Sequence, residues 1–403
     1  MHVERISNWN ELESLAPAWN QLAQGVPFRS WQWLGSWWRH YGAGSVEQAH
    51  ERAPRQELFV LAVRDAAGTP IAFAPWRLER QAGRGNIVKF LGSGEVCTDH
   101  LTVLCCTGME LEAADAVADW LARVSKTTAR PNASLAKWDQ LEFGGIADDD
   151  LAMNHLVGRL AERGALVDRR PAEHCWRLEL PRGWEDYLRT LSKSHRKQLR
   201  RFQRRLFDGG RAVLHTAKTV AEFERAMDLL IDLHQRRRQS LGERGCFESP
   251  RFAAFLRDAA RQFFELGQLG LCWLELDSHP IACEFQLLGE GTIYAYQSGI
   301  EPAVLDEEPG RLATLAVLRA AVANGHRTYD LLRGDEAYKA HWRAQPRACV
   351  DIRVWPGQGA DWVRRGAWRA RENMKYWVKG AWQWAGAFDP RGKAAPHASP
   401  RQR

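Results

Sequence analysis

The chain has 403 residues, of which 45% are hydrophobic and 26% charged, and its formal net charge is +7. These fractions are typical of a globular protein, and the length exceeds one ordinary core, so we expect two domains and a tail. No run of eighteen apolar residues occurs, and the opening Met1-His-Val-Glu-Arg5 lacks an apolar signal core. We therefore expect a cytoplasmic protein without a membrane span or a secretory leader.

The positive charge is concentrated at the C-terminus. Residues 356–403 hold ten Lys/Arg against three Asp/Glu, an excess equal to the net charge of the whole chain. Residues 1–355 are therefore formally neutral, which argues against a general polyanion binder. Eight scattered cysteines without a CxxC pair indicate buried reduced thiols, and thirteen histidines without ligand spacing predict no metal site.

The first predicted helix is rich in tryptophan. Phe28-Arg-Ser30 precedes Trp31-Gln-Trp-Leu34 and Trp37-Trp-Arg-His40, with Ser30 in the position of an N-cap. We expect these aromatic side chains to pack into the core.

Two later segments resemble each other. One predicted hairpin consists of the strands Leu58–Asp65 and Pro70–Pro75. The other consists of Leu271–Asp277 and Pro280–Phe285. In each hairpin the second strand begins with Pro-Ile-Ala. Each hairpin is followed by a further strand and a helical stretch, at residues 111–124 and 311–322. The pattern predicts a tandem duplication of one α/β unit with mixed sheets. We place the units at residues 1–172 and 173–356, and a tail at 357–403.

Three segments carry candidate functional residues. In the first unit, Cys97-Thr-Asp99-His100 places Asp99 either at a cleft between the units or in a simple turn. The helix that opens the second unit, over Leu188–Leu206, is basic on several faces and includes Arg196 and Lys197. No acid lies between Asp186 and Asp208, so a phosphate- or substrate-binding role competes with an ordinary solvated face.

A third segment lies before the helix at 311–322. Glu308-Pro309-Gly310-Arg311 follows the strand Thr292–Ser298 and exposes backbone N–H groups at the positive end of a helix dipole, which suits a pyrophosphate. A purely structural turn is the competing interpretation.

The stretch 328–342 is the most informative. A short apolar strand, Thr328–Leu332, leads directly into a group of polar, charged and aromatic side chains, and strand ends of this kind place ligands in α/β proteins. Asp335 and Glu336 are candidate general bases, with Asp99 as a partner across the cleft. An ion-paired loop is the alternative. The candidate substrate-binding residues here are Arg333, Tyr338, Lys339 and Trp342.

The tail contains a predicted amphipathic helix over residues 361–388. Val363, Trp377 and Trp384 share an apolar side, and Arg364 and Lys375 lie opposite. Contact with the inner face of an anionic membrane or with a partner groove, and packing on the protein's own second unit, remain equal alternatives.

Together these residues carry a family resemblance. The chain resembles the CelD/BcsL-type acetyltransferases of the GNAT superfamily, which are linked with polysaccharide and cellulose synthesis. The resemblance is carried by Phe28-Arg-Ser-Trp, Ser192-Lys-Ser-His-Arg196, Tyr296-Gln-Ser-Gly299, Pro309-Gly310 and Tyr329–Lys339. The resemblance covers about residues 5–355. It implies two tandem GNAT-like domains, as in Fem-type transferases.

The resemblance also implies a donor and a reaction. The donor would be acetyl-CoA or another acyl-CoA, with Pro309, Gly310 and Arg311 at its pyrophosphate and the strand residues Gln297 and Ser298 beside its pantetheine. The reaction would be N- or O-acyl transfer to a sugar or amino-sugar acceptor. Two alternatives stay open: a Fem-like transfer from aminoacyl-tRNA, the one nucleic acid expected, and a non-catalytic accessory module of a membrane-bound polysaccharide synthase.

Overall fold

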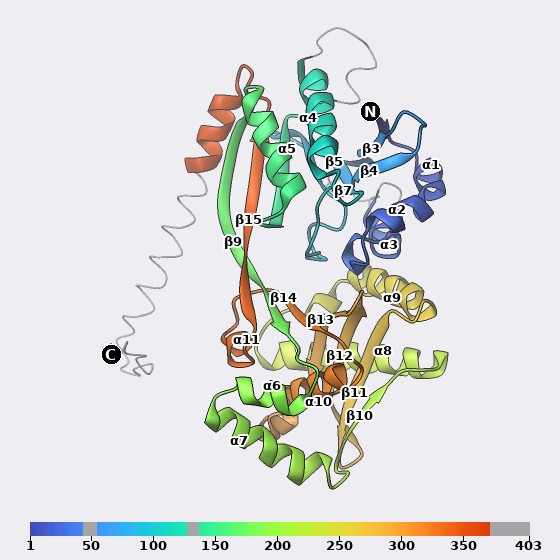
Figure 1. Ribbon diagram of the computed structural model, residues 1–403, viewed down its shortest axis with the longest axis vertical. Coiled ribbons are helices and arrows are strands. Elements are labelled where there is room, and N and C mark those ends of the chain that lie inside the picture. The colour runs from blue at the N-terminus through green and yellow to red at the C-terminus, as the bar shows by residue number, and fades with distance from the viewer. Residues whose placement is uncertain (43–54, 127–136, 371–403) are drawn as a thin grey trace, which may run out of the picture.

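The computed structural model describes residues 1–42, 55–126 and 137–370. Figure 1 shows two α/β halves, one above the other, joined by two long strands that run through both. The N-terminal half consists of β1 (His2–Ile6), α1 (Trp9–Ser14), α2 (Ala16–Leu22), η1 (Pro27–Arg29), α3 (Trp31–Tyr41), β2 (Arg55–Leu58), β3 (Val60–Arg64), β4 (Pro70–Ala74), β5 (Trp76–Gln81), β6 (Gly85–Phe90), β7 (Leu104–Cys105), α4 (Glu110–Lys126), β8 (Gln140–Ala147) and α5 (Leu151–Glu162).

The long strands are β9 (Leu166–Glu179) and β15 (Gln345–Trp355), which pair with each other over most of their length. Between them lies the C-terminal half, with α6 (Trp184–Thr190), α7 (Lys193–Phe202), η4 (Gln203–Phe207), β10 (Ala212–Thr216), α8 (Val220–Ser240), η5 (Cys246–Glu248), α9 (Pro250–Glu265), β11 (Leu269–Leu276), β12 (His279–Leu288), β13 (Thr292–Ile300), η6 (Pro302–Glu307), α10 (Pro309–Ala323), β14 (Thr328–Arg333) and α11 (Ala337–His341).

One sheet runs through both halves. Its eleven strands follow the order β10-β11-β12-β13-β14-β9-β15-β8-β6-β5-β2, and a smaller sheet has the order β1-β3-β4-β7. Among the described residues, only β13–β14 and β6–β8 pair in parallel. The mixed, mainly antiparallel α/β class predicted from the sequence is confirmed.

The strand pairing supports the predicted duplication. In the C-terminal half, β12–β13 is antiparallel, β13–β14 parallel and β14–β9 antiparallel. In the N-terminal half, β5–β6, β6–β8 and β8–β15 repeat that pattern. Each half therefore ends on a long strand from the other side of the sequence, and the boundary proposed at residue 172 falls inside β9.

The two predicted hairpins differ in one respect. The pairing of β11 with β12 is as predicted, and so is that of β3 with β4. The first hairpin, however, breaks at Phe59 and Pro75, where its strands leave the small sheet and continue as β2 and β5 in the large one. A hydrogen bond from the Phe59 N–H to the Trp76 carbonyl, 3.1 Å long, holds this crossing point.

The predicted basic helix is two helices. α6 ends at Thr190, and α7 begins at Lys193 after Ser192, whose hydroxyl accepts a hydrogen bond from the His195 N–H. Expecting one continuous helix was wrong because Ser192 acts as an N-cap, a role in which serine competes with helix continuation.

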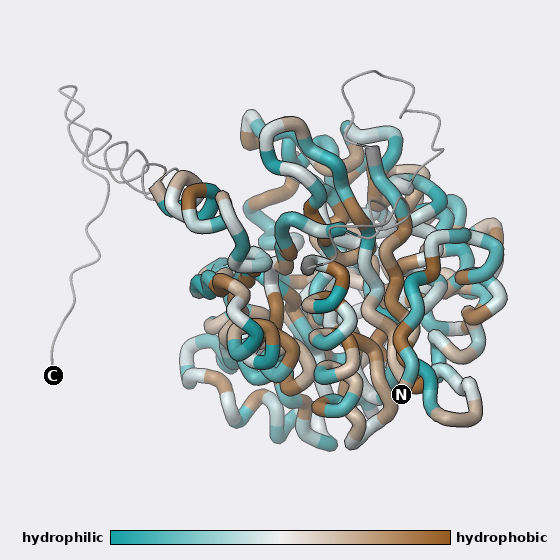
Figure 2. The backbone as a smooth tube through the Cα atoms, turned by 90° about the horizontal axis from the view of Figure 1, so that it is seen from above, coloured by the Kyte–Doolittle hydropathy of each residue, from teal (hydrophilic) through white to brown (hydrophobic). Residues whose placement is uncertain are grey.

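The core follows the apolar faces of these elements. Figure 2 shows hydrophobic backbone running through the middle of the body and hydrophilic backbone in many outer turns. α8 packs against β11, β12 and β13, whereas α10 belongs to the cluster on the opposite face of that sheet. Ser30 caps α3, and Trp33 and Trp37 are fully buried, so both predictions for this helix are confirmed.

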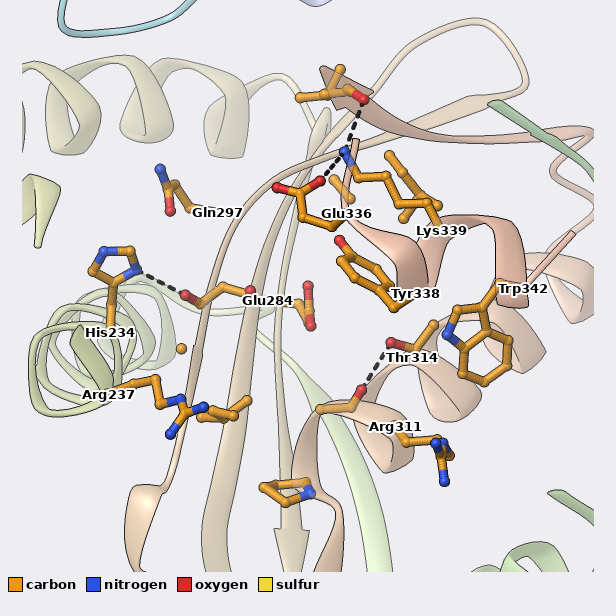
Figure 3. Close-up of a pocket in the computed structure, with 18 of the residues that line it drawn as sticks. His234, Arg237, Glu284, Gln297, Arg311, Thr314, Glu336, Tyr338, Lys339 and Trp342 are labelled. Atoms are coloured by element: carbon orange, nitrogen blue, oxygen red, sulfur yellow. Dashed lines mark hydrogen bonds and ion pairs between the residues drawn. The ribbon is translucent and has the colours of Figure 1, made fainter. Parts of the chain in front are cut away.

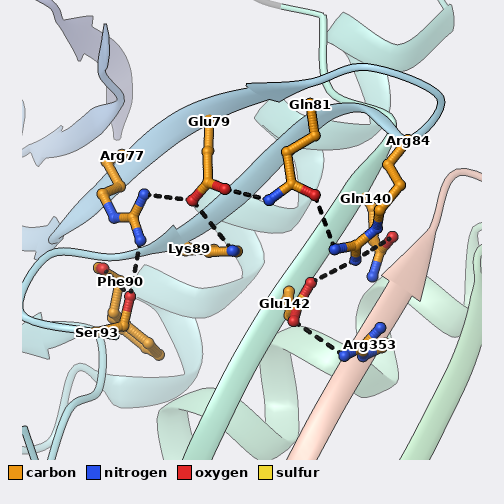
Figure 4. Close-up of polar contacts among 10 residues, drawn as sticks. All are labelled: Arg77, Glu79, Gln81, Arg84, Lys89, Phe90, Ser93, Gln140, Glu142 and Arg353. Carbon is orange, nitrogen blue, oxygen red and sulfur yellow. Dashed lines mark hydrogen bonds and ion pairs between the residues drawn. The ribbon is translucent and has the colours of Figure 1, made fainter. Parts of the chain in front are cut away.

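The polar face of the N-terminal sheet carries a continuous charge network, drawn in Figure 4. The Glu79 carboxylate accepts from Arg77 at 2.7 Å and from Lys89 at 3.1 Å, and Arg84 and Arg353 both donate to Glu142. Burial alone would raise the pKa of Glu79, but Arg77 and Lys89 outweigh it and lower the pKa to about 2. The network links β5, β6, β8 and β15.

A loop from the N-terminal half docks on the end of β14. Asp99 is buried and accepts from the Arg333 backbone N–H at 2.9 Å, while its other oxygen lies 3.1 Å from the Arg333 guanidinium. His100 lies 3.2 Å from the Asp330 carboxylate. Tyr296 reaches back to donate to the Val96 carbonyl at 2.7 Å. These contacts fix the two halves together at the strands that line the pocket described below.

The start of the tail is helical over residues 361–370 and packs through its polar side. Arg369 pairs with Asp168 on β9, and the Trp368 ring lies between the guanidinium groups of Arg170 and Arg353. Trp362 and Val363 are instead 62% and 73% exposed. The rest of the predicted helix, residues 371–388, lies outside the described residues.

The cysteines are all free thiols, but the prediction that they are buried holds for only part of the set. Cys97 and Cys106 are exposed, and Cys246 is half-buried; the buried thiols are Cys105, Cys175, Cys272, Cys283 and Cys349.

The His100–Asp330 contact predicts a pH-dependent stability. Burial favours neutral His100, but Asp330, with a further contribution from Asp99, outweighs both burial and the nearby Arg29, so the His100 pKa is raised. A raised folded-state pKa stabilises the protein below the unfolded value of about 6.5, and this contribution is lost as the pH rises through the folded value. Between pH 6 and pH 9 the wild type should lose more unfolding free energy than His100→Gln, measured by urea titration. Parallel pH profiles for the two proteins would contradict this.

Candidate functional site

The candidate site is an opening between two parallel strands. β13 and β14 pair only at Thr292–Thr328, Ile293–Tyr329 and Tyr294–Asp330, and then diverge. An irregularity in the β12–β13 register, between Phe285 and Gln286, adds one residue to β13 where the strands separate. Beyond Tyr294, the β14 side of β13 therefore has backbone groups that β14 does not satisfy.

This opening holds a pocket of about 1070 Å³. It is formed by α8, β13, the start of α10, the end of β14, and α11, as Figure 3 shows. The volume is at the upper end of the range for cofactor and substrate sites. Its charged side chains are Arg237, Arg238, Arg311, Arg333, Lys339, Glu284, Glu308 and Glu336.

The N-terminus of α10 lies at the pocket. Glu308 adopts a left-handed conformation (φ 56°, ψ 50°) as the N-cap, and Pro309 and Gly310 begin the helix. The Glu308 carboxylate pairs with Arg311 and accepts from Gln198 of α7 at 3.3 Å. A Cβ added to Gly310 would meet only Ile300, at 3.9 Å. The first turn of α10 is therefore open to a ligand, and its positive dipole end favours an anion.

Glu284 is an ionisable group that the sequence predictions missed. It lies on β12 opposite Ser298, and Figure 3 places it in the pocket between His234 and Tyr338. Burial raises the pKa of its carboxyl to about 8. At this value the group exchanges a proton near neutral pH, as a general base requires.

His234 fixes the wall of the pocket beside β13. Its Nδ1 lies 2.9 Å from the Ser298 carbonyl, which can only accept, so Nδ1 carries the proton. Nε2 is then the acceptor for the Cys246 thiol at 3.4 Å. Burial, with Arg238 nearby, lowers the pKa of His234 and keeps the ring neutral. The close approach of α8 to β13 needs Gly299, because a Cβ added there would lie 2.5 Å from the backbone nitrogen of His234.

The end of β14 is held by Lys339. This side chain is only 2% exposed, and its ammonium group donates to the carbonyls of Leu332, Arg333 and Gly334 at 3.0 to 3.1 Å. Glu336 lies 2.9 Å from the same nitrogen. The hydrogen-bond donors of the Lys339 ammonium group are therefore engaged by groups of the chain itself, although Lys339 lines the pocket.

The three predicted acids lie in three environments. Asp335 points away from the pocket and accepts from Trp176 and His174, contacts that lower its pKa. Glu336 lines the pocket and is 58% exposed. Asp99 is buried behind Arg333 and is not part of the lining. Only Glu336 therefore meets the pocket directly.

The structure brings together most of the other predicted residues. The pocket lining includes Gln297, Ser298, Pro309, Gly310, Arg311, Arg333, Tyr338, Lys339 and Trp342. Arg196 and Lys197 lie outside it, on α7. Besides Glu284, the polar lining residues outside the predicted site include His234, Arg237, Arg238 and Thr314. An acid between the buried residues Cys283 and Phe285 was the available signal for Glu284.

The matching opening in the N-terminal half is filled. β6 and β8 pair only at Ile87–Gln140 and Val88–Leu141. Beyond these pairs the rings of Phe90 and Phe143 pack at a centroid distance of 4.7 Å. The duplicated strand pattern therefore yields an open polar pocket in one half and a packed apolar contact in the other.

Two further findings concern metals and membranes. Within residues 1–42, 55–126 and 137–370, no group of three or more His, Cys, Asp or Glu side chains is arranged to hold a metal ion. Over the same residues, the helices are too short or too polar to cross a bilayer.

Comparison with known families finds a match over the segment that forms the pocket. Residues 193–340 match the family model described as an acetyltransferase (GNAT) domain. The C-terminal half is thus similar to a GNAT acetyltransferase domain over these residues. This match covers α7 through most of α11, and thus most of the residues that line the pocket.

Solved structures extend the likeness to both halves. FemX is similar over 87% of this chain and 97% of its own, with 9% identity and a TM-score of 0.57. A conserved protein of unknown function from Bacteroides thetaiotaomicron is similar over 88% of this chain and 100% of its own, with 11% identity and a TM-score of 0.53. At such identities the likeness shows the fold alone. No curated protein matches the sequence.

The contact at Gly299 predicts that this glycine is required. In Gly299→Ala the new Cβ would lie 2.5 Å from the backbone nitrogen of His234 and 2.8 Å from the Leu233 Cβ. Helix α8 must therefore move away from β13. We expect a loss of about 1 to 3 kcal/mol in the free energy of unfolding by urea titration. Gly158→Ala on α5 is the matched control, because its Cβ would meet nothing within 4 Å. Equal stability of the two variants would contradict the role of this contact.

Proposed function

We propose that the protein catalyses, in this pocket, the transfer of an acyl group from acetyl-CoA, or another acyl-CoA, to an amine or hydroxyl group of a sugar or amino-sugar acceptor. The observation that carries this proposal is the divergence of β13 and β14 at the N-terminus of α10, with an acid of raised pKa in the pocket between them. The GNAT domain match supports acyl transfer in general. A role in polysaccharide or cell-envelope synthesis follows from the CelD/BcsL-type sequence resemblance.

The residues at α10 suit an acyl-CoA donor. Pro309, Gly310 and Arg311 would hold its pyrophosphate at the open helix N-terminus, because backbone N–H groups there point toward an anion. Gln297 and Ser298, on the unpaired side of β13, would flank the pantetheine arm. The donor supplies an acyl group that is activated as a thioester.

The chain's own residues would then handle the proton. As the acceptor nitrogen or oxygen attacks the acyl carbon, Glu284 takes the proton that this nucleophile loses, while the carbon–sulfur bond breaks and the sulfur leaves as a thiolate. Backbone N–H groups of β13 beyond Tyr294 would stabilise negative charge on the acyl oxygen. Glu336, at the solvent-facing side, and Arg333 would contact the acceptor.

Asp335 and Asp99 are less suited to proton transfer from the acceptor. Asp335 lies outside the pocket lining, and Asp99 is engaged by Arg333. We assign Asp99 the role of positioning Arg333 and the end of β14. Lys339 has a similar positioning role, through the three carbonyls it binds.

A second candidate function is transfer from an aminoacyl-tRNA. Its support is the basic surface of α7, which borders the loop before α10. A tRNA donor would bind with steep salt dependence and without competition from CoA. A non-catalytic accessory role is the third alternative; it requires that neither donor binds.

The proposal predicts a specific effect of Glu284→Gln. We expect kcat to fall about 100-fold or more while the dissociation constant for acetyl-CoA, measured by calorimetry, stays within about twofold. The wild-type rate should rise with pH up to about 8 and then level, because the carboxylate form is the active base. Asp335→Asn is the matched control and should retain activity. Full activity in Glu284→Gln, or no acetyl-CoA binding by the wild type, would contradict the proposal.

Peripheral contact with the inner face of the membrane belongs to the same proposal. The helix at residues 361–370 places its charged side on the sheet and leaves Trp362 and Val363 exposed, as interfacial anchors require. Trp362→Ser with Val363→Ser should reduce cosedimentation with vesicles containing phosphatidylglycerol by at least about half. Leu266→Ser, which changes a side chain that is 54% exposed at the end of α9, should not. Unchanged cosedimentation of the double variant would contradict the membrane contact.

A further inference from the structure

The basic surface of α7 is unusual because much of its charge is unpaired. Three arginines at its margins are neutralised by the acids Asp186, Glu185 and Glu307. In the part of the chain that the structure describes, the side chains of five cations between these make no hydrogen bond or ion pair: Lys193, Arg196, Lys197, Arg201 and Arg204. Apart from Arg196, which is half-buried, these side chains are exposed.

One side of α7 faces the beginning of α10. Gln198 donates to the Glu308 carboxylate at 3.3 Å, and Arg205 lies 3.3 Å from Glu307. Arg201 is three residues after Gln198 on α7, so it belongs to the same side of that helix, and Arg205 follows in η4. Lys197 is four residues before Arg201 and borders that side. We call Lys197 and Arg201 the α7 cation pair.

Through the contact of Gln198 with Glu308, the side of α7 that bears Arg201, with Lys197 at its border, faces the start of α10, at which the donor's pyrophosphate would lie. The two acids at the start of α10, Glu307 and Glu308, are already neutralised. Glu308 pairs with Arg311, and Glu307 pairs with Arg205. An anion beyond the α10 terminus would thus meet two free cations. Arginine and lysine are the side chains that bind phosphate most strongly, through charge-assisted hydrogen bonds.

CoA carries a third phosphate group, on the 3′ oxygen of its ribose, separated from the pyrophosphate by the sugar. We propose that Lys197 and Arg201 bind this 3′-phosphate, so that the protein distinguishes CoA from dephospho-CoA. This inference rests on the proposed acyl-CoA donor. Two free cations beside the pocket match one phosphate dianion. The formally neutral body of residues 1–355 favours this single phosphate over a nucleic acid, whose binding rests on many cations.

The test compares two ligands that differ by this one phosphate. We expect the wild type to bind CoA about tenfold more tightly than dephospho-CoA in calorimetry, since one or two charge-assisted hydrogen bonds are at stake. In the double variant Lys197→Ala with Arg201→Ala, CoA should bind about tenfold more weakly and dephospho-CoA should be unaffected. The wild-type preference for CoA should also weaken as the salt concentration rises.

Lys193→Ala is the matched control. It removes the same charge from an exposed position of α7 that lies away from the side bearing Gln198 and Arg205. It should retain the tenfold preference for CoA. Because the substituted side chains are exposed, the variants should melt at the wild-type temperature.

The outcomes separate this inference from the proposed function. Equal wild-type binding of CoA and dephospho-CoA, or a preference that survives in the double variant, would overturn the 3′-phosphate site while leaving the acyl-CoA donor in place. Failure of the wild type to bind either ligand would overturn both. A preference lost equally in Lys193→Ala would also overturn the site, because it would show a general effect of charge.

Discussion

The pocket depends on how the end of β14 is kept away from β13. A strand that leaves its neighbour loses hydrogen bonds, and buried backbone groups without partners are costly. Here the loss is offset within the chain: the Lys339 ammonium group satisfies three successive carbonyls, and Asp99 accepts the Arg333 N–H. Leu332 adopts a left-handed conformation (φ 57°) at the same place. The side chains of Lys339 and Asp99 thus replace the missing part of the sheet.

This arrangement gives the N-terminal half a role although its own opening is filled. Asp99 and His100 come from that half and reach β14 at Arg333 and Asp330. The N-terminal copy of the duplicated unit therefore acts as a support. It has the Phe90–Phe143 contact at the position that corresponds to the pocket, and it supplies groups that shape the pocket of the other half.

Sequence patterns predicted the structural features that depend on residues close together along the chain. The hairpins, the Pro309-Gly310 helix start and the strand before Arg333 all follow from local turn and periodicity rules. Most residues expected at the site line the pocket for the same reason. Glu284 was missed because its pKa is set by burial among residues distant in sequence. Asp335 and Glu336 are adjacent, and only tertiary contacts with His174 and Trp176 turn one of them away. The break of the basic helix at Ser192 reflects a capping hydrogen bond that competes with helix periodicity.

The shared sheet has a mechanical consequence. Because β9 and β15 cross from one half to the other and pair with each other between them, the halves have no hinge at which they could open and close as separate bodies. Ligand entry therefore does not depend on the halves moving apart, and the short helix α11 and the start of α10 line the pocket. The same strands make the molecule one cooperative folding unit: a fragment cut near residue 172 would expose two long, unpaired strand edges, which are sites of aggregation.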